Sequence, residues 1–413
     1  MTASTDERRR LGRIAALTLG ICFLLGAVSR GSTEAYAVFL LPLSQTFGWD
    51  RAEASSVYSV YMLFFGLSAP LVGRLFDRWG PGVVYPFGLL CLGIGALAAS
   101  QLERLWQFYI FIGMLSGIGA TGVGVVPHGA LLARWFRGRL TTSIAFVSAS
   151  SGVGTLILAP TVQVMIDGMG WRPSYAVMGG TILAMVLVIR LMPWRLIEAG
   201  RPADPAPVRK GMPATAAAMT LRQALRTRTF WAMFVVNFLT AVGMFAVNPQ
   251  IVAFLVETGF PPLTAASAFG AAGIAATAGL LVFGWLADRL GRLVSISISY
   301  SMTLAGMVIL HFLEAAPVYW LLVLFVVVYG PSFGSRGPII ASMAAGIFGR
   351  GRELGSIMGA VQMGMGVGAA VGATAGGLLH DWTGGYDWVL VFAFVNCLLP
   401  VAIFWTVPDF RRR

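Results

Sequence analysis

Charge is scarce in this sequence of 413 residues. Only 11% of the residues are Asp, Glu, Lys or Arg, whereas 57% are hydrophobic. A soluble domain carries about 25% charged residues, so this chain has too few charges to cover the surface of a soluble protein of its length. The mean hydropathy of +0.79 agrees. The sequence therefore excludes the soluble classes and indicates a protein that crosses a membrane several times.

Lysine and cysteine are rarer still. The single lysine, Lys210, does not belong to a glycine-rich phosphate-binding loop, so nothing in the sequence supports ATP hydrolysis. The three cysteines, Cys22, Cys91 and Cys397, lie in apolar stretches without disulfide or metal spacing. No His, Cys or carboxylate set has metal-ligand spacing, and no Ser-His-Asp arrangement stands out. We expect no enzyme activity, cofactor or metal site.

Long apolar stretches dominate instead. A helix needs about 20 mostly apolar residues to cross roughly 30 Å of hydrocarbon. The stretches that meet this length are 14–40, 53–73, 82–100, 105–133, 140–166, 173–194, 229–256, 264–286, 293–313, 317–346, 354–379 and 386–407. The predicted fold class is an all-α membrane protein with twelve transmembrane helices.

The positive charges predict the orientation of these spans. If the N-terminus is cytoplasmic, the outer segments hold only Arg51, Arg104 and Arg172, and nearly all other basic residues lie inside. Such a bias fixes topology, so both termini are expected in the cytoplasm of a multi-pass inner-membrane protein. The net charge of +12 is then explained by the cytoplasmic segments of a protein whose partner is the lipid bilayer. It does not indicate binding to nucleic acid.

A polar interval divides the chain into two parts. The interval 195–228 is rich in proline and basic residues, and proline at this density opposes a continuous helix. The predicted organisation is described by five consecutive ranges. These are a cytoplasmic tail 1–13, a six-helix bundle 14–194, a linker 195–228, a second six-helix bundle 229–407 and a tail 408–413.

The two bundles repeat one another. Gly73-Arg-Leu-Phe-Asp77-Arg78-Trp-Gly80 closes span two, and Gly284-Trp-Leu-Ala-Asp288-Arg289-Leu-Gly291 closes span eight 211 residues later. Asp167-Gly-Met-Gly170 and Asp381-Trp-Thr-Gly384 match at an offset of 214. Such constant offsets predict pseudo-symmetric halves.

Two six-helix halves with this Gly-x-x-x-Asp-Arg-x-Gly turn resemble the major facilitator superfamily. Phe47-Gly48-Trp49, Trp135-Phe136-Arg137, Gly170-Trp171-Arg172 and the segment from Gly377 to Tyr386 further resemble the monocarboxylate transporter family and its oxalate/formate-exchanger relatives. The resemblance implies a monomeric secondary transporter that works by alternating access. Its implied substrates are a small organic anion, a short monocarboxylate such as lactate or pyruvate, and a cotransported proton.

The sequence departs from that family in three places. The family's acidic-glycine-tryptophan motif before span one is missing from Met1 to Arg13. A family lysine in span one aligns with Glu34, and a family arginine in span eight falls near Leu280. The basic residues that the resemblance credits with holding the carboxylate are thus absent from their expected places, which leaves open a new substrate or a relocated charge.

Apart from residues at span boundaries, four charged residues fall within the spans, where a charge costs about 2.5–3.5 kcal/mol. Arg190 lies near a span end and can extend to the interface. Arg30 and Glu34 are one turn apart on one helix face; they form either a local ion pair or a cavity face where Glu34 accepts a proton and Arg30 meets an anion. Arg336 in span ten is the first candidate for binding a carboxylate, and its alternative is a structural pair.

Prolines and glycines surround Arg336, so we expect the helix to open there. His128 in span four is a second proton-coupling candidate, or else a satisfied interior histidine. Further candidate substrate contacts, each alternatively a helix–helix hydrogen bond, are Tyr58, Tyr61, Asn237, Asn248, Tyr329 and Gln362. The glycines at positions 364, 368, 372 and 376 predict close helix packing.

The repeated turns suggest gates. In the superfamily, pairs such as Asp77-Arg78 and Asp288-Arg289 resemble residues that bridge the halves when the cytoplasmic side is closed, with Arg139 and Arg352 as expected partners. The alternative is a solvated turn that anchors the helix ends. Two other functions stay open for the whole chain: a proton-coupled exporter of larger amphipathic compounds, and a sensor with the same fold that transports nothing.

Overall fold

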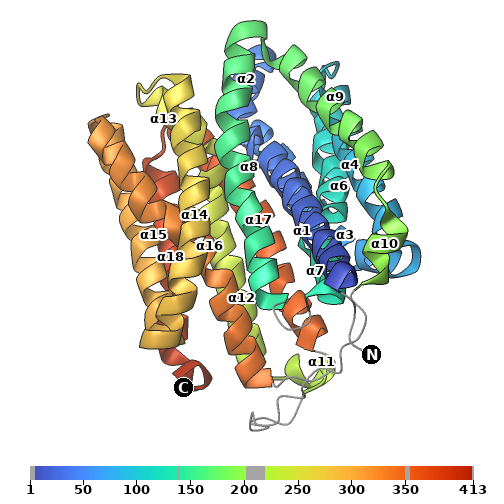
Figure 1. Cartoon of the computed structure of the whole chain (residues 1–413). Helices are drawn as coiled ribbons and strands as arrows, with labels where there is room; N and C mark the ends of the chain where they lie inside the picture. Colours follow the sequence, from blue (N-terminus) through green and yellow to red (C-terminus); the bar gives the residue numbers. More distant parts are fainter. Residues whose placement is uncertain (1–4, 137–139, 201–218, 349–353, 412–413) are drawn as a thin grey trace.

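Every regular element of the protein is a helix in the part that the computed structural model describes, residues 5–136, 140–200, 219–348 and 354–411. Twelve helical segments are long and apolar enough to cross a membrane. The predicted all-α fold with twelve spans is therefore confirmed (Figure 1).

The first six spans form the N-terminal half. Spans one and four are each assembled from more than one helical piece, and the others are single helices. The elements are α1 (Thr5–Glu34), α2 (Tyr36–Phe47), α3 (Arg51–Trp79), α4 (Pro81–Ala99), α5 (Leu105–Phe108), η1 (Tyr109–Leu115), α6 (Ser116–Gly122), α7 (Val125–Trp135), α8 (Leu140–Met169) and α9 (Trp171–Arg190).

The last six spans form the C-terminal half, in which only span seven is interrupted. The elements are α12 (Arg228–Val247), η2 (Asn248–Gln250), α13 (Ile251–Glu257), α14 (Pro262–Leu290), α15 (Arg292–Ala315), α16 (Tyr319–Phe348), α17 (Leu354–Thr383) and α18 (Asp387–Thr406), followed by η3 (Pro408–Arg411).

The predicted linker contains two short helices. Helix α10 (Trp194–Ala199) packs on the N-terminal half, where Trp135 Nε1 donates to the carbonyl of Ile197 at 2.7 Å. Helix α11 (Leu221–Ala224) packs on the C-terminal half, and the preceding Met219 amide donates to the carbonyl of Phe348 at 3.0 Å. Both ends of the interval are thus attached to the half they adjoin.

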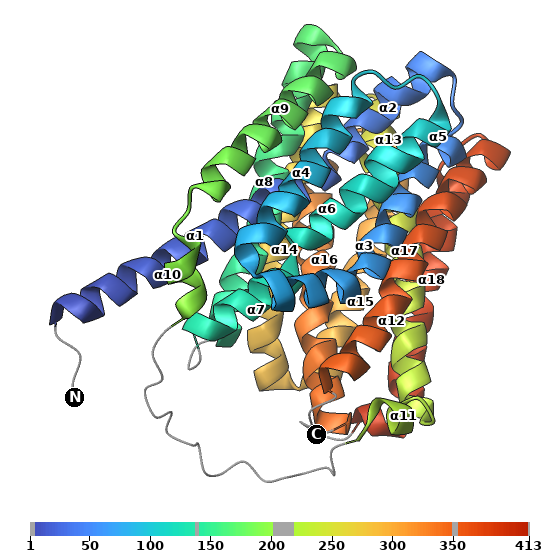
Figure 2. The same ribbon diagram turned by 90° about the vertical axis from the view of Figure 1, so that its right-hand side faces the viewer.

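Both chain ends lie at the same end of the helical bundle, as Figures 1 and 2 show. We call this the termini end. The opposite end, where α2 and α13 finish and α3 begins, is called the far end. At the termini end, Gly80 and Gly291 close the two repeated turns with φ of 71° and 88°. Glycine tolerates such positive φ values, which explains why the turn motif ends in glycine.

The two halves meet along two helix pairs. Helix α8 packs on α14, and α3 packs on α17. Small residues permit these contacts: a Cβ on Gly152 would lie 2.2 Å from the carbonyl oxygen of Gly273, and one on Gly377 would lie 2.5 Å from the Cα of Ala52. Span one packs on α8 and span seven packs on α17, so each lies next to one of these pairs.

Spans one and seven are interrupted at equivalent depths. A single residue, Ala35, separates α1 from α2, and the short 3₁₀ turn Asn248–Gln250 separates α12 from α13. Glu34 ends α1 and Asn248 begins the 3₁₀ turn, and the two side chains hydrogen-bond to each other. The two interruptions therefore lie next to one another.

Span ten corrects one expectation. Helix α16 runs unbroken through Pro331 and Pro338, so it does not open beside Arg336 as predicted. The Ser332 and Ser335 hydroxyls donate to the carbonyls of Tyr329 and Ser332 at 2.7 and 3.0 Å. Neighbouring helices compensate for backbone hydrogen bonds that prolines remove in membranes, and α14 packs closely against this stretch.

The glycine ladder of α17 makes the predicted close contact. Cβ atoms on Gly364, Gly368, Gly372 and Gly376 would lie 2.2–2.7 Å from carbonyl oxygens of α12. Real Cβ atoms do not approach so closely, and the two helices therefore pack backbone to backbone. Span seven and span eleven form a tightly joined pair within the C-terminal half.

Candidate functional site

A cavity of about 420 Å³ lies between the two halves. Its wall includes Ile144 near the start of α8 and Met358 near the start of α17, so the cavity extends toward the termini end. It also includes Arg30 and Arg336, one guanidinium from each half. Arg30 and Arg336, which the sequence analysis selected because charges are costly in a membrane, therefore line the same cavity.

Arg30 and Glu34 form the predicted ion pair. Arg30 Nη2 donates to Glu34 Oε1 at 2.6 Å. The second carboxylate oxygen, Oε2, accepts a hydrogen bond from Asn248 Nδ2 of the other half at 3.1 Å. The Glu34 side chain is only 7% exposed, whereas that of Arg30 is 28% exposed. The carboxylate is enclosed, and the guanidinium is the member of the pair that reaches the cavity.

A smaller cavity of about 60 Å³ continues from this pair toward the far end. Arg30, Glu34, Asn248 and Tyr329 all line it. The hydroxyl of Tyr329 finds no hydrogen-bond partner among the described residues. Arg30 therefore stands between the large cavity and a small polar space that holds its carboxylate partner.

Arg336 is held differently. Its Nε donates to the Ser299 hydroxyl at 3.2 Å, its Nη2 donates to the Thr303 hydroxyl, and its Nη1 lies 2.9 Å from the Met244 sulfur. The guanidinium carbon lies 4.2 Å from the centre of the Tyr300 ring, which is cation–π geometry. Arg336 is 5% exposed, and no ion pair involves it in the described ranges. Two hydroxyls and a carbonyl oxygen of α15 therefore accept hydrogen bonds from this guanidinium.

The remaining cavity candidates differ in position. Asn237, Gln362 and His128 line the large cavity. Asn237 Nδ2 donates to the carbonyl of Met233 at 2.9 Å, and the Nε2 of His128 has no partner in the part of the chain described. Tyr58 and Tyr61 line neither this cavity nor the smaller one.

Tyr58 and Tyr61 instead line a space of about 30 Å³ inside the N-terminal half. The Tyr61 hydroxyl lies 2.8 Å from that of Thr33, and the Tyr58 side chain interacts with Asn248 of the other half. The Tyr58 ring stacks on Phe245 with centroids 6.0 Å apart. Tyr58 therefore supports the cavity wall from behind.

The wall of the large cavity is mainly apolar. Three phenylalanines from three helices contribute to it, Phe65 of α3, Phe245 of α12 and Phe333 of α16. The rings of Phe245 and Phe333 lie 6.3 Å apart in an edge-to-face arrangement. Leu280, near the position where the resemblance places an arginine, lines the cavity as well. The site combines two guanidiniums with an aromatic and aliphatic surface.

The far end of the space between the halves is closed by a charged group that sequence reasoning missed. Asp381 of α17 accepts hydrogen bonds from the amides of Arg51 and Ala52 at 2.9 and 2.7 Å. The Arg51 side chain pairs with Glu257 of α13. A carboxylate from one half thus caps the first turn of α3 in the other, where an anion is favoured. The only available signals were the motif around Asp381 and its separation from other acids.

His380 and Tyr386 complete the far-end group. His380 Nε2 lies 3.9 Å from Glu257 Oε2, and the rings of His380 and Tyr386 are 4.5 Å apart. Burial raises the pKa of Tyr386 to about 12, so its hydroxyl stays protonated. The structure is therefore closed at the far end, and its large cavity lies on the termini side.

Of the predicted gate residues at the termini end, Arg78 and Arg289 have described side chains, and each lies against a ring of its own helix. Arg78 and Arg289 are exposed and lie 5.9 and 4.5 Å from the rings of Trp79 and Trp285 of their own helices. Their neighbours in the motif, Asp77 and Asp288, belong to α3 and α14, but their side chains lie outside the described part, as do the whole residues Arg139 and Arg352.

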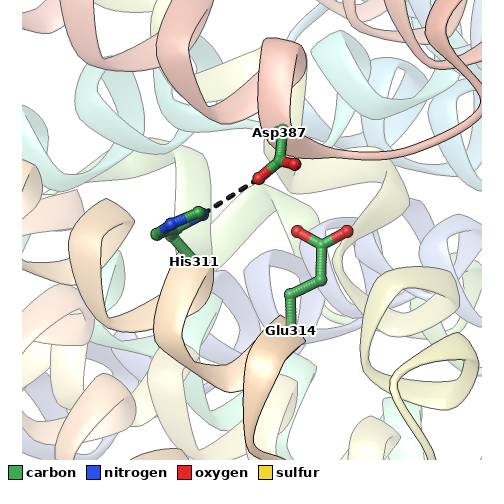
Figure 3. Close-up of side chains that lie close together, drawn as sticks. All are labelled: His311, Glu314 and Asp387. Atoms are coloured by element: carbon green, nitrogen blue, oxygen red, sulfur yellow. Dashed lines mark hydrogen bonds and ion pairs between the residues drawn. The ribbon is translucent and has the colours of Figure 1, made fainter.

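One group of side chains has ligand atoms suited to a metal. Figure 3 shows His311 and Glu314 of α15 facing Asp387 at the start of α18. His311 Nδ1 lies 3.0 Å from Asp387 Oδ1, and the ligand atoms of the three residues lie within 4.8 Å of one another. The His311 and Asp387 side chains are 59% and 67% exposed, and none of the three lines the cavity. The group links two helices of one half at the far end.

Comparisons with known proteins agree with this architecture. The family model of the Major Facilitator Superfamily matches residues 22–336 and 233–413. Monocarboxylate transporter 13 of Rattus norvegicus is 26% identical over 94% of this chain and 87% of its own length. Monocarboxylate transporter 4 of the same organism is 25% identical over 91% of this chain and 79% of its own length.

Solved structures share the fold at low identity. A bacterial homolog of the human lysosomal transporter Spinster, in an inward-facing unoccupied conformation, has a TM-score of 0.73 at 13% identity and covers 96% of this chain and 97% of its own. The nucleoside transporter NupG has a TM-score of 0.75 at 15% identity and covers 94% and 100%. This chain belongs to the Major Facilitator Superfamily and is a membrane transporter related to the monocarboxylate transporters.

Proposed function

We propose that this protein is a secondary transporter that moves a small organic monoanion together with a proton by alternating access. The observation that carries the proposal is the Arg30–Glu34 pair, which places a partly exposed guanidinium in the cavity and an enclosed carboxylate behind it. The names of the relatives support a monocarboxylate, and lactate and pyruvate are the first members to test.

The pair provides a physical route to coupling. Glu34 and a substrate carboxylate compete for the same guanidinium, because Arg30 Nη2 already bonds to Glu34. When Glu34 takes up a proton, Arg30 loses its charged partner and becomes available for the substrate. One proton then accompanies one anion. The loaded carrier is neutral overall and crosses without work against the membrane potential, which is about 2.3 kcal/mol per charge per 100 mV.

Arg336 contributes the second positive charge of the cavity. Its donors face the hydroxyls of α15, so in this state it raises the potential of the cavity more than it offers free N–H groups. Asn237 and Gln362 line the same wall and supply neutral hydrogen-bonding groups. His128 is a second candidate for carrying the proton. The basic residues that the family carries elsewhere are thus replaced by Arg30 and Arg336.

The arginine distribution supports an orientation in which the termini end lies on the cytoplasmic side of the inner membrane. In that orientation the cavity of this structure faces the cytoplasm, and the far-end group around Asp381 closes the outer side. The gates proposed for the cytoplasmic side, Asp77-Arg78 and Asp288-Arg289 with Arg139 and Arg352, would then engage only in the opposite state.

Transport by purified monomer in proteoliposomes tests the proposal. We expect counterflow of radiolabelled lactate or pyruvate in the wild type, uptake driven by an inward proton gradient, and loss of both in Arg30→Gln. Arg190→Gln is the matched control, because Arg190 donates to the Gly82 carbonyl at 3.4 Å and does not line the cavity.

Three results would reject the proposal. Normal anion counterflow in Arg30→Gln would show that Arg30 does not bind the anion. Uptake of tetraphenylphosphonium in place of carboxylates would favour an exporter of amphipathic compounds. Binding of carboxylates without any counterflow would favour a sensor.

A further inference from the structure

The cavity offers one guanidinium to a ligand, not two. Arg30 is 28% exposed in its side chain and bonds to a single carboxylate through Nη2. Arg336 is 5% exposed and directs Nε and Nη2 to Ser299 and Thr303. One free planar fork matches one carboxylate, so the charge of the cavity favours a monoanion over a dianion.

The cavity is much larger than a three-carbon acid. Its volume is about 420 Å³. At roughly 30 Å³ per non-hydrogen atom, the share of a water molecule in the liquid, a three-carbon hydroxy acid with six such atoms fills less than half of it. Cavities of about 300–1,000 Å³ enclose ligands of drug size.

The wall of the large cavity is well suited to an apolar group. Phe65, Phe245 and Phe333 come from α3, α12 and α16 and line the cavity together. Methionines also line it, and their flexible thioethers adapt to irregular apolar shapes and to ring edges. These residues are Met244, Met358 and Met365. No acidic residue appears in the described lining of this cavity, so it has no counter-charge for a cation.

We infer that the substrate is an amphipathic monocarboxylate with an aryl or branched alkyl body, larger than lactate or pyruvate. Its carboxylate would meet Arg30, and its apolar body would lie among the phenylalanines and methionines. The inference rests on the proposed function, since it names the anion class for the same site. It assigns Phe333 a role in specificity, because this half-buried ring lies on the same helix as Arg336 and faces Phe245.

Binding to purified protein in detergent, measured by calorimetry, tests this inference with three probes: 3-phenylpropionate, lactate and 3-phenylpropionamide. We expect 3-phenylpropionate to bind about tenfold to hundredfold more tightly than lactate, as expected from burying one phenyl group. The amide has the same body without the charge, and we expect it not to compete.

Variants identify the apolar wall. Phe333→Ala should weaken 3-phenylpropionate about tenfold and leave lactate unchanged, with Phe333→Leu intermediate. Val327→Ala is the control, because Val327 lies on the same helix but is 58% exposed on the outside; it should change neither ligand. A thermal melt of each variant verifies folding.

The outcomes separate this inference from the proposed function. If lactate binds as tightly as 3-phenylpropionate, or if both Phe333 variants leave the difference intact, the inference on substrate size is wrong while the anion site stands. If Arg30→Gln binds both acids normally, or the amide competes fully, the carboxylate site itself is wrong, and the proposed function fails with it.

Discussion

The two halves present the same kind of group to one cavity in different electrical settings. In the N-terminal half Arg30 pairs with a carboxylate on its own helix. In the C-terminal half Arg336 contacts neutral hydroxyls and an aromatic ring. Asn248 of the C-terminal half donates its side-chain amide to the Glu34 carboxylate, so the two halves also meet through this hydrogen bond.

The comparison shows that pseudo-symmetric backbones hold asymmetric chemistry. In the proposed mechanism, the carboxylate beside Arg30 is the group of the N-terminal half that carries the proton. The C-terminal half has a permanent charge whose partners cannot titrate near neutral pH. We therefore assign coupling to the N-terminal half and a fixed positive potential to the C-terminal half, and three predictions test this division.

The largest effect is expected from removing the buried charge of the C-terminal half. Arg336→Gln removes the guanidinium that donates to Ser299 and Thr303, and leaving such buried hydroxyls without their hydrogen-bond donor costs about 1–3 kcal/mol. We expect a clearly lower Tm together with loss of anion uptake. Arg30→Gln should lose uptake at a nearly unchanged Tm, because Arg30 is partly exposed. Equal melting temperatures for the two variants would show that the settings of the arginines do not differ.

The second prediction separates coupling from binding. Glu34→Gln removes the titratable group but keeps a polar side chain next to Asn248. We expect the variant to exchange anions across the membrane while a proton gradient no longer drives accumulation. The readouts are counterflow and gradient-driven uptake in the same proteoliposomes.

Moving the carboxylate from one half to the other sharpens this second test. The double variant Glu34→Gln with Asn248→Glu moves the carboxylate to the C-terminal half, and we expect partial recovery of proton-driven uptake because the carboxylate stays near Arg30. Normal gradient-driven accumulation in Glu34→Gln alone would transfer the coupling role elsewhere, with His128 as the next residue to replace.

The smallest effect is expected at the far end, where the halves also differ in charge: the N-terminal half supplies Arg51 and a helix start, and the C-terminal half supplies acids. Asp381→Asn keeps the shape but removes the anion from the first turn of α3, a loss of about 0.3–2 kcal/mol. We expect a larger population that is open at the far end, seen as longer distances between spin labels at Glu103→Cys and Tyr319→Cys, both exposed.

The control for this variant lies in the same turn. Glu53→Gln changes a residue whose Oε2 accepts from the Asp50 amide at 3.2 Å within one half, and it should leave the label distances unchanged. Identical distances in Asp381→Asn and wild type would mean that the far-end group does not hold the halves together.

Much of the fold could be predicted because it depends on local composition. The spans follow from apolar length, and the repeated turns follow from glycine and the Asp-Arg pairs. The course of single helices could not be predicted as well. Span one is interrupted at Ala35, where no proline or glycine signals a break, whereas α16 continues through Pro331 and Pro338. Tertiary packing decides both cases, and sequence spacing does not record it.

The candidate site shows the same limit. Sequence reasoning found Arg30, Glu34 and Arg336 because charges are costly in lipid, and the pairing of the first two follows from helical spacing. The partners of Arg336 lie on α15, 33 and 37 residues away, and the Asp381 contact spans 330 residues. Contacts between distant segments depend on how helices are placed, so residue type alone could not reveal them.

The glycine ladder has a mechanical consequence. It holds the stretch Gly364 to Gly376 of α17 against Phe234 to Ala246 of α12, so we expect the two helices to move as one rigid unit. Asn248 directly follows α12, close to Ala246, whose carbonyl lies against Gly376 of α17. Asp381 lies near the far end of α17. The hydrogen bond from Asn248 to Glu34 and the contact of Asp381 with the start of α3 therefore belong to one rigid pair of helices. We expect the loss of one contact to weaken the other.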